Sequence, residues 1–220
     1  MAKTILTPLQ IKLLHILASD PYISKRFYFT GGTVLSEFYL QHRLSEDFDL
    51  FSDKEVYLPS VVSFLTKIKS KIGIVEREHR PFMGLHSFML HLKDKGKFKI
   101  DFNFYPHPRI NIGKKYKNLH IDSLYDIAVN KIHTMFMKPR ARDFVDLYFI
   151  FRETDFRLER LILDAKAKFD WHIDPLLLGS QMRKVTILTE LPRMLKPFDR
   201  KDMEKFFFHQ AEKLKKEILK

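Results

Sequence analysis

The chain has 220 residues, of which 45% are hydrophobic, so it can bury a sizeable core and is too apolar for a disordered polypeptide. Its formal charge of +12 is spread over both halves and favours a nucleic acid or nucleotide partner, because solubility alone needs a smaller charge. The lack of cysteine excludes disulfides, cysteine-ligated zinc and thiol catalysis, and the lack of a long apolar segment or signal peptide predicts a cytoplasmic protein that does not enter membranes.

The first predicted element is a helix over residues 7–18. Thr7 is a favourable N-cap and Pro8 a favourable first helical residue. Apolar residues then recur at helical spacing until Asp20-Pro21 ends the pattern. We expect this helix to cover a sheet and assign it no chemistry.

A glycine turn follows the first predicted strand. The apolar run at 27–29 leads directly into Gly31-Gly32-Thr33, and apolar residues at helical spacing continue over 34–41. This order predicts a buried strand, a tight turn and a helix whose N-terminus is led by glycines. Free N–H groups and a positive partial charge at that point suit a phosphate.

Two aspartates come next in an alternating segment. Asp47 and Asp49 point to one face of a short strand, while Phe48 and Leu50 point to the other. Mg²⁺ usually takes one or two protein carboxylates together with substrate phosphate oxygens, so this pair suits a metal–phosphate complex. The alternative is an ordinary turn with an acidic strand end, which like-charge repulsion disfavours.

The order Gly-Gly-Thr, helix and Arg-x-Ser-x-Asp-x-Asp-Leu-Phe resembles the nucleotidyltransferases of the AbiEii/AbiGii toxin family, within the DNA polymerase β-like nucleotidyltransferase superfamily. The resemblance implies that Asp47 and Asp49 bind Mg²⁺. It also implies a first group of residues that contact the NTP substrate: Gly31, Gly32, Thr33, Arg43 and Ser45.

A helix over 59–71 and three strands over 74–79, 87–92 and 97–105 are predicted next, the last two joined by a turn at 94–96. Asp101 lies at the centre of the third strand, on its polar face. The resemblance implies that this third carboxylate lies beside the Asp-x-Asp strand, where it binds a second metal or accepts the proton of the attacking hydroxyl. The alternative is a solvent-facing aspartate on an edge strand.

Pro106 and Pro108 predict a boundary between a catalytic core, 1–108, and a helical lobe, 109–220, which together could also count as one domain. The basic run at 109–118 is more often a solvated loop than a nucleic-acid contact. A short strand is predicted over 119–121.

The second family-like segment predicts a helix from Asp122 or Ser123 to about Phe136 and a new helix near Arg140, because Pro139 breaks the pattern. Lys131 lies among apolar positions and needs an anionic partner. The resemblance implies that Lys131 contacts nucleotide phosphate and that Asp143 or Asp146 positions it. The alternative, which is compatible with this role, is an internal ion-pair network of these three residues with Arg140 and Arg142. Amphipathic helices over 156–169 and 174–184 and a last helix after Asp199 complete the chain.

We therefore expect an α/β (α+β) fold: a minimal polymerase β-like nucleotidyltransferase core with a small mixed sheet, followed by a helical lobe. The expected activity is two-metal, Mg²⁺-dependent transfer of NMP from NTP to an acceptor hydroxyl, with release of pyrophosphate. The resemblance implies a toxin that acts on RNA, at the 3′ end of tRNA, and that has a cognate antitoxin as its partner.

Two alternatives remain open from the sequence. The acceptor hydroxyl could belong to a protein, including Ser45 of this chain. The chain could also be a non-catalytic nucleotide- or RNA-binding module, which three carboxylates that repel phosphate in the absence of metal disfavour.

Overall fold

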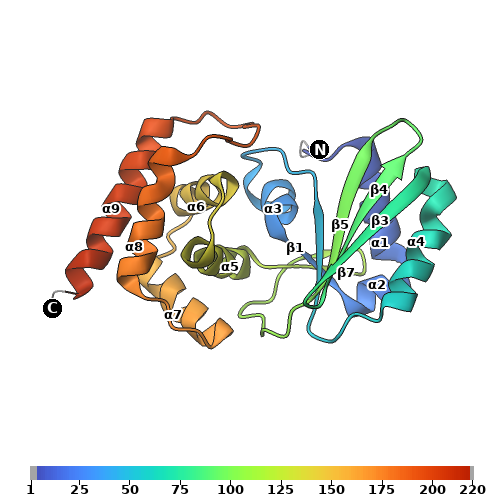
Figure 1. The fold of residues 1–220 in the computed structure, drawn as a ribbon, viewed down its shortest axis with the longest axis horizontal. Coiled ribbons are helices and arrows are strands. Elements are labelled where there is room, and N and C mark those ends of the chain that lie inside the picture. The colour runs from blue at the N-terminus through green and yellow to red at the C-terminus, as the bar shows by residue number, and fades with distance from the viewer. Residues whose placement is uncertain (1–3, 219–220) are drawn as a thin grey trace. The chain divides into compact units, whose positions relative to one another are not determined.

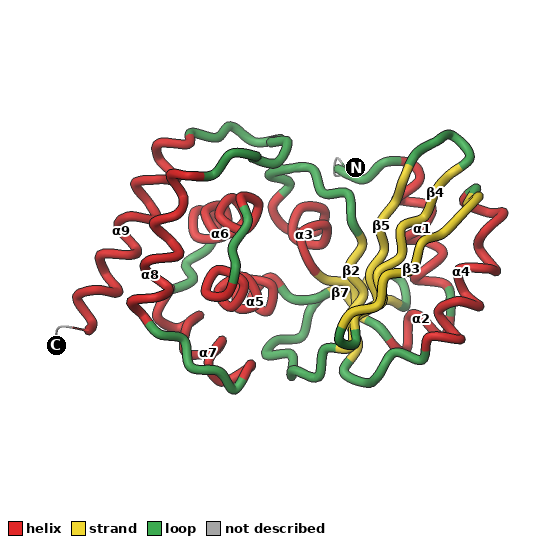
Figure 2. The backbone as a smooth tube through the Cα atoms, in the orientation of Figure 1, coloured by secondary structure: helices red, strands yellow, loops and turns green. Residues whose placement is uncertain are grey.

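The computed structural model describes residues 4–218, and within them two compact units (Figure 1). Unit 1 comprises 4–39, 45–108 and 112–123; unit 2 comprises 40–44, 109–111 and 124–218. The strands belong to unit 1, while unit 2 consists of helices and loops (Figure 2). The predicted domain boundary at Pro108 stays a prediction, although 112–123 belong with the unit that precedes it.

Unit 1 is built on a seven-stranded mixed sheet in the order β3-β4-β5-β2-β1-β7-β6. The pairs β2–β5 and β1–β7 are parallel, and the other neighbours are antiparallel. The mixed α/β fold predicted from the sequence is confirmed. The strands are β1 (Tyr28–Thr30), β2 (Phe48–Ser52), β3 (Ile74–Phe82), β4 (Leu85–Leu92), β5 (Lys97–Phe104), β6 (Lys115–Tyr116) and β7 (Leu119–Ile121).

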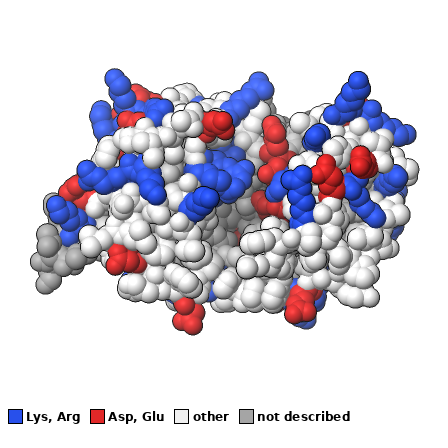
Figure 3. All heavy atoms as spheres, in the orientation of Figure 1, with Lys and Arg blue, Asp and Glu red and all other residues white. Residues whose placement is uncertain are grey.

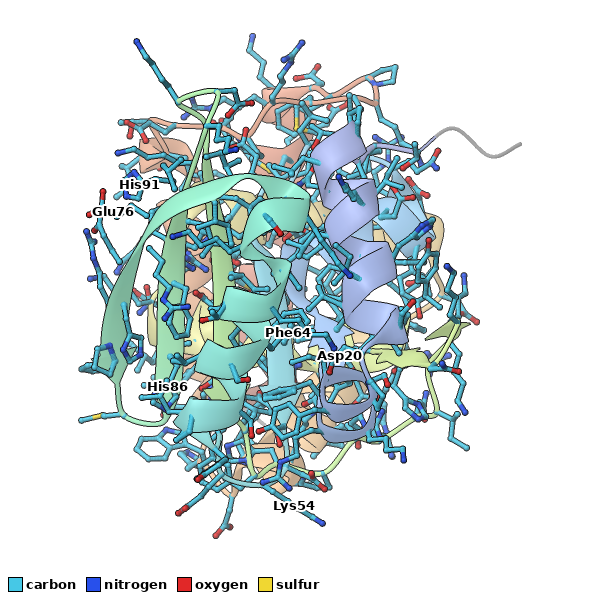
Figure 4. The ribbon with its side chains drawn as sticks, turned by 90° about the vertical axis from the view of Figure 1, so that its right-hand side faces the viewer. Asp20, Lys54, Phe64, Glu76, His86 and His91 are labelled. Atoms are coloured by element: carbon cyan, nitrogen blue, oxygen red, sulfur yellow. The ribbon has the colours of Figure 1, made fainter. Side chains whose placement is uncertain are left out.

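Three helices cover one face of the sheet: α1 (Pro8–Ser19), α2 (Pro21–Arg26) and α4 (Leu58–Ile72) (Figure 1). Figure 4 looks onto this face, with α4 and α1 in front of the strands and Phe64 on α4. Thr7 is the N-cap of α1, as predicted, and it forms a capping box with Gln10, in which Thr7 N donates to Gln10 Oε1 over 2.9 Å. Gly73, at a φ of 75°, ends α4 in the left-handed conformation.

The core of unit 1 fixes which side chains of β2 and β5 point inward. Leu50 and Phe102 are fully buried, and Phe29 packs on Phe48 with ring centroids 4.7 Å apart. Because side chains alternate along a strand, Asp49 and Asp101 point to the opposite face. The predicted alternation is present over 48–52, but Asp47 lies in the loop just before β2 and not on the strand itself.

A helical segment follows β1 and lies beside β1 and β2. It begins as α3 (Gly31–Val34) and continues as a π-helix, η1 (Leu35–Leu40), before Gln41 adopts a φ of 49°. The helix is predicted from apolar spacing, but its π form is not. Short π-helical turns inside helices frequently lie at functional sites.

Unit 2 is a bundle of α5 (Leu124–Met137), α6 (Ala141–Glu153), α7 (Leu158–Phe169), α8 (Pro175–Arg183), a 3₁₀ turn, η2 (Lys184–Ile187), and α9 (Arg200–Ile218). Its core includes Phe144 against Phe207, with ring centroids 5.0 Å apart. The predicted break at Pro139 separates α5 from α6. The last two residues of the predicted C-terminal helix lie outside the described residues.

The surface carries the excess of basic residues on both units, as the face drawn in Figure 3 shows. Across residues 4–218, the helices are too short or too polar to cross a membrane.

Candidate active site

A row of polar residues crosses four neighbouring strands of unit 1. Asp49 on β2 lies opposite Asp101 on β5 in the parallel pair, Thr30 on β1 lies opposite Asp49, and Ser87 on β4 lies opposite Asp101. Neighbouring strands are about 4.8 Å apart, so the two aspartates start from adjacent positions on one face. Because β5 is flanked by β4 and β2 and Asp101 is buried, Asp101 is not the solvent-facing aspartate of an edge strand.

Two neighbours hold the Asp101 carboxylate. The Ser87 hydroxyl donates to Asp101 Oδ1 over 2.7 Å, and the Lys99 ammonium forms an ion pair with Asp101 Oδ2. The same ammonium lies 4.0 Å from Asp47 Oδ2. Sequence reasoning missed both neighbours. Lys99 could have been found from its place on the polar face two residues before Asp101, but Ser87 requires the strand register.

The Asp49 carboxylate packs directly on the start of the helical segment. A Cβ atom added to Gly31 would lie only 2.1 Å from Asp49 Oδ2, and Gly31 has a φ of +80°. Both observations require glycine at this position. The predicted glycine turn and the predicted metal-binding aspartate therefore meet in the structure.

Thr33 and Ser45 join the helical segment to the loop before β2. The buried Thr33 hydroxyl donates to the main-chain oxygen of Asp47 and lies 2.9 Å from the Ser45 hydroxyl. The Gln10 side chain donates to the carbonyl oxygens of Ser45 and Glu46 over 3.1 and 3.2 Å. These contacts fix the path of the chain into Asp47, and the nucleotide contacts predicted for Thr33 and Ser45 stay predictions.

The donor set of this face suits Mg²⁺. Asp47, Asp49 and Asp101 supply carboxylate oxygens, and a cationic group, Lys99, already lies against two of them. Within residues 4–218, no three carboxylate or imidazole groups converge closely enough to hold a metal by themselves. Mg²⁺ usually takes one or two protein carboxylates and completes its shell with water and substrate phosphate.

The other predicted site residues form a buried ion-pair cluster in unit 2. Lys131 Nζ lies 2.6 Å from Asp143 Oδ1 and 2.6 Å from Asp146 Oδ2. Arg43 donates to both oxygens of Asp146, through Nε over 2.6 Å and Nη2 over 2.9 Å. His42, which sequence reasoning missed, lies 2.9 Å from Asp146 Oδ1 through Nε2.

The charges in this cluster set its protonation states. Burial alone would raise the pKa of Asp146, but the charges of Lys131 and Arg43 and the hydrogen bonds from His42 and Arg43 hold it well below its usual value. Burial lowers the pKa of His42 and outweighs the opposing effect of Asp146. The carboxylate is therefore ionised and the imidazole neutral near pH 7.

The sequence left open whether Lys131, Asp143 and Asp146 contact nucleotide, form an internal ion-pair network, or do both. Lys131 pairs with both Asp143 and Asp146, and the main-chain N–H of Arg140 donates to Asp143 over 2.9 Å. The ion pairs of Lys131 with both aspartates and of Arg140 with Asp143 are thus present, whereas the part predicted for Arg142 stays a prediction. Arg43 is only 2% exposed. The contacts of Arg43, Lys131 and Asp146 with nucleotide stay predictions.

Comparison with known proteins decides the family. The sequence profile described as "Nucleotidyl transferase AbiEii toxin, Type IV TA system" matches residues 12–217. The chain belongs to the AbiEii nucleotidyl transferase toxin family. The AbiEii resemblance and the enzyme class predicted from the sequence, a nucleotidyltransferase, are confirmed by this match.

Solved structures agree with the AbiEii fold. JHP933 from Helicobacter pylori is 21% identical, with a TM-score of 0.58 over 95% of this chain and 90% of that one. An H. pylori protein assigned as a nucleotidyltransferase is 19% identical, with a TM-score of 0.61 over 95% and 92% of the two chains. At these identities the likeness shows a shared fold. A search of curated protein sequences finds no significant match.

The contact between Gly31 and Asp49 predicts a selective effect of Gly31→Ala. Gly73→Ala is the matched control, because Gly73 also has a positive φ but a Cβ there meets only Lys93 atoms at 3.8 Å or more. Gly73→Ala should lose about 1 kcal/mol of stability in urea denaturation from left-handed backbone strain, and Gly31→Ala at least as much. Only Gly31→Ala, which displaces the Asp49 carboxylate, should lose Mg²⁺-dependent NTP binding in calorimetry. Equal binding by the two variants would contradict this account of Gly31.

The buried cluster predicts a large cost for Lys131→Met. Removing the ammonium leaves two buried carboxylates with one cation fewer, which should lower the free energy of unfolding by about 3–5 kcal/mol. Lys138→Met, on an exposed lysine that follows the same helix, should change it by less than about 0.5 kcal/mol. Chemical denaturation followed by circular dichroism measures both values. Similar stabilities for the two variants would show that Lys131 does not support the fold.

Proposed function

We propose that this AbiEii-family protein transfers NMP from an NTP to a hydroxyl of RNA, at the 3′ end of tRNA, in a reaction that requires Mg²⁺. One observation carries the proposal: the parallel register of β2 and β5 sets Asp49 opposite Asp101 on one face of the sheet, and Asp49 packs on Gly31. The two carboxylates and the glycines that begin the helical segment therefore lie next to each other within unit 1.

The chain's own residues have distinct roles in this proposal. Asp47 and Asp49 hold the metal, and Asp101 holds a second metal or accepts the proton of the acceptor hydroxyl. Main-chain N–H groups of Gly31 and Gly32 bind triphosphate oxygens. When bound, Mg²⁺ neutralises phosphate charge and stabilises the attacking and leaving oxygens.

The transfer is an in-line displacement at the α-phosphorus. The acceptor oxygen forms a bond to that phosphorus, the bond to the bridging oxygen of the β-phosphate breaks, and pyrophosphate leaves. The acceptor proton goes to a carboxylate of the site, and the position of Asp101 beside Asp49 supports Asp101 in this role.

Charge and family support the biological setting. A net charge of +12 attracts a polyanion such as RNA. Membership of a family described as part of a type IV toxin–antitoxin system supports a separately encoded antitoxin as partner. A cytoplasmic location stays a prediction.

A protein acceptor is the second candidate, because Ser45 precedes Asp47 by only two residues. The Ser45 hydroxyl lies 2.9 Å from that of Thr33. Ser45 could be nucleotidylated only if it left this contact. The location of the label in one experiment separates the two acceptors.

The test incubates the full chain with Mg²⁺, each α-labelled NTP and total RNA. We expect label on tRNA-sized RNA, and none with Asp49→Asn, Asp101→Asn or excess EDTA. Asp53→Asn, at an exposed position just after β2, should keep wild-type activity. Label on the protein itself would favour the protein acceptor. Equal labelling by wild type and Asp49→Asn would contradict the proposed site.

A further inference from the structure

We propose that Lys99 is a positioning residue that competes with the divalent cation: its ammonium holds Asp47 and Asp101 in the metal-free protein and leaves them when the metal binds. Lys99 thereby sets the metal affinity of the site. The inference rests on the proposed metal-dependent function and assigns a role to a residue outside the predicted motif.

The position of Lys99 follows from the strand that carries it. Lys99 precedes Asp101 by two residues on β5, so both side chains point to the same face of the sheet. From there its ammonium pairs with Asp101 Oδ2 and lies 4.0 Å from Asp47 Oδ2. The Lys99 ammonium is thus an ion-pair partner of two carboxylates that belong to different segments.

The exposure of these groups allows exchange. The side chains of Lys99 and Asp47 are 33% and 31% exposed, whereas those of Lys131 and Asp143 are 11% and 0% exposed. Lysine is a flexible point charge on a four-carbon stem, so Lys99 can move its ammonium into solvent. Lys131, by contrast, is enclosed between two buried carboxylates.

Electrostatics makes the two cations exclusive. Aspartates grouped on one face of a sheet repel one another, and the ammonium relieves this repulsion. A divalent cation bound to the same oxygens relieves it more strongly but is itself repelled by the ammonium. Removal of the Lys99 charge should therefore lower the thermal stability of the metal-free protein and raise its affinity for the metal. These two effects have opposite signs.

The chain offers a matched control for the position of the charge. Lys97 lies on the same strand and the same face, two residues further from Asp101, and is exposed. Substitution of Lys97 changes the net charge equally but leaves the Asp47–Asp101 pair untouched. A difference between the two lysines therefore reports the contact and not the overall charge.

The experiment titrates Mn²⁺ into the full chain without nucleotide and measures free Mn²⁺ by electron paramagnetic resonance. We expect Lys99→Met to bind Mn²⁺ about tenfold more tightly than wild type, the order of effect of one charge at a partly exposed site. Its melting temperature in EDTA should be lower than that of wild type. Lys97→Met should change the affinity less than about twofold, because exposed charges are screened. Lys99→Gln, which keeps a hydrogen-bond donor, carries the test if Lys99→Met does not fold.

Asp49→Asn separates failure of this inference from failure of the proposed function. If wild type binds Mn²⁺, Asp49→Asn does not, and both Lys99 variants bind no more tightly than wild type, the role of Lys99 is overturned while the metal site stands. If wild type and Asp49→Asn bind Mn²⁺ equally, the metal-dependent function is overturned together with this inference.

Discussion

The parallel pairing of β2 with β5 is the constraint on which the candidate site depends. Its register sets Asp49 opposite Asp101, and the same register turns Leu50 and Phe102 to the buried side of the sheet. A slip by one residue would bury the aspartates and expose the phenylalanine and leucine, so the hydrophobic core and the chemistry select one pairing. Gly31 adds the second element, because only a residue without a Cβ atom lets the Asp49 carboxylate lie against the helical start.

The carboxylates of the two units differ in their burial and in their cationic partners. In unit 2 Asp146 is fully buried and pairs with Lys131, Arg43 and His42, so that loss of a partner would leave a buried charge less well compensated. In unit 1 Asp47 and Asp101 share one partly exposed ammonium. We propose that the metal of this AbiEii-family nucleotidyltransferase binds in unit 1, at the face that carries Asp47, Asp49 and Asp101.

Local sequence patterns predicted the features that depend on neighbours in the chain: the alternation in β2, the polar face of β5 with Asp101, the glycine turn before α3 and the break at Pro139. Of the features that depend on distant pairing, the place of Asp101 beside the Asp-x-Asp strand came from the family resemblance, and the others were not predicted. The ladder that joins β4, β5 and β2 brings Ser87 to Asp101, and the fold brings His42 to Asp146 across 104 positions. The π-helical form of η1 also left no signal in the apolar spacing, because the same residues suit an α-helix.

The central claim is that Asp49 and Asp101 form one metal-binding face. Anomalous diffraction from crystals grown with Mn²⁺ and a non-hydrolysable NTP tests it most directly. The account predicts an anomalous peak within coordination distance of Asp49, close to Asp47 and Asp101, with triphosphate oxygens at Gly31 and Gly32. A well-ordered nucleotide with no peak near Asp49, or with Mn²⁺ bound elsewhere on the chain, would contradict it.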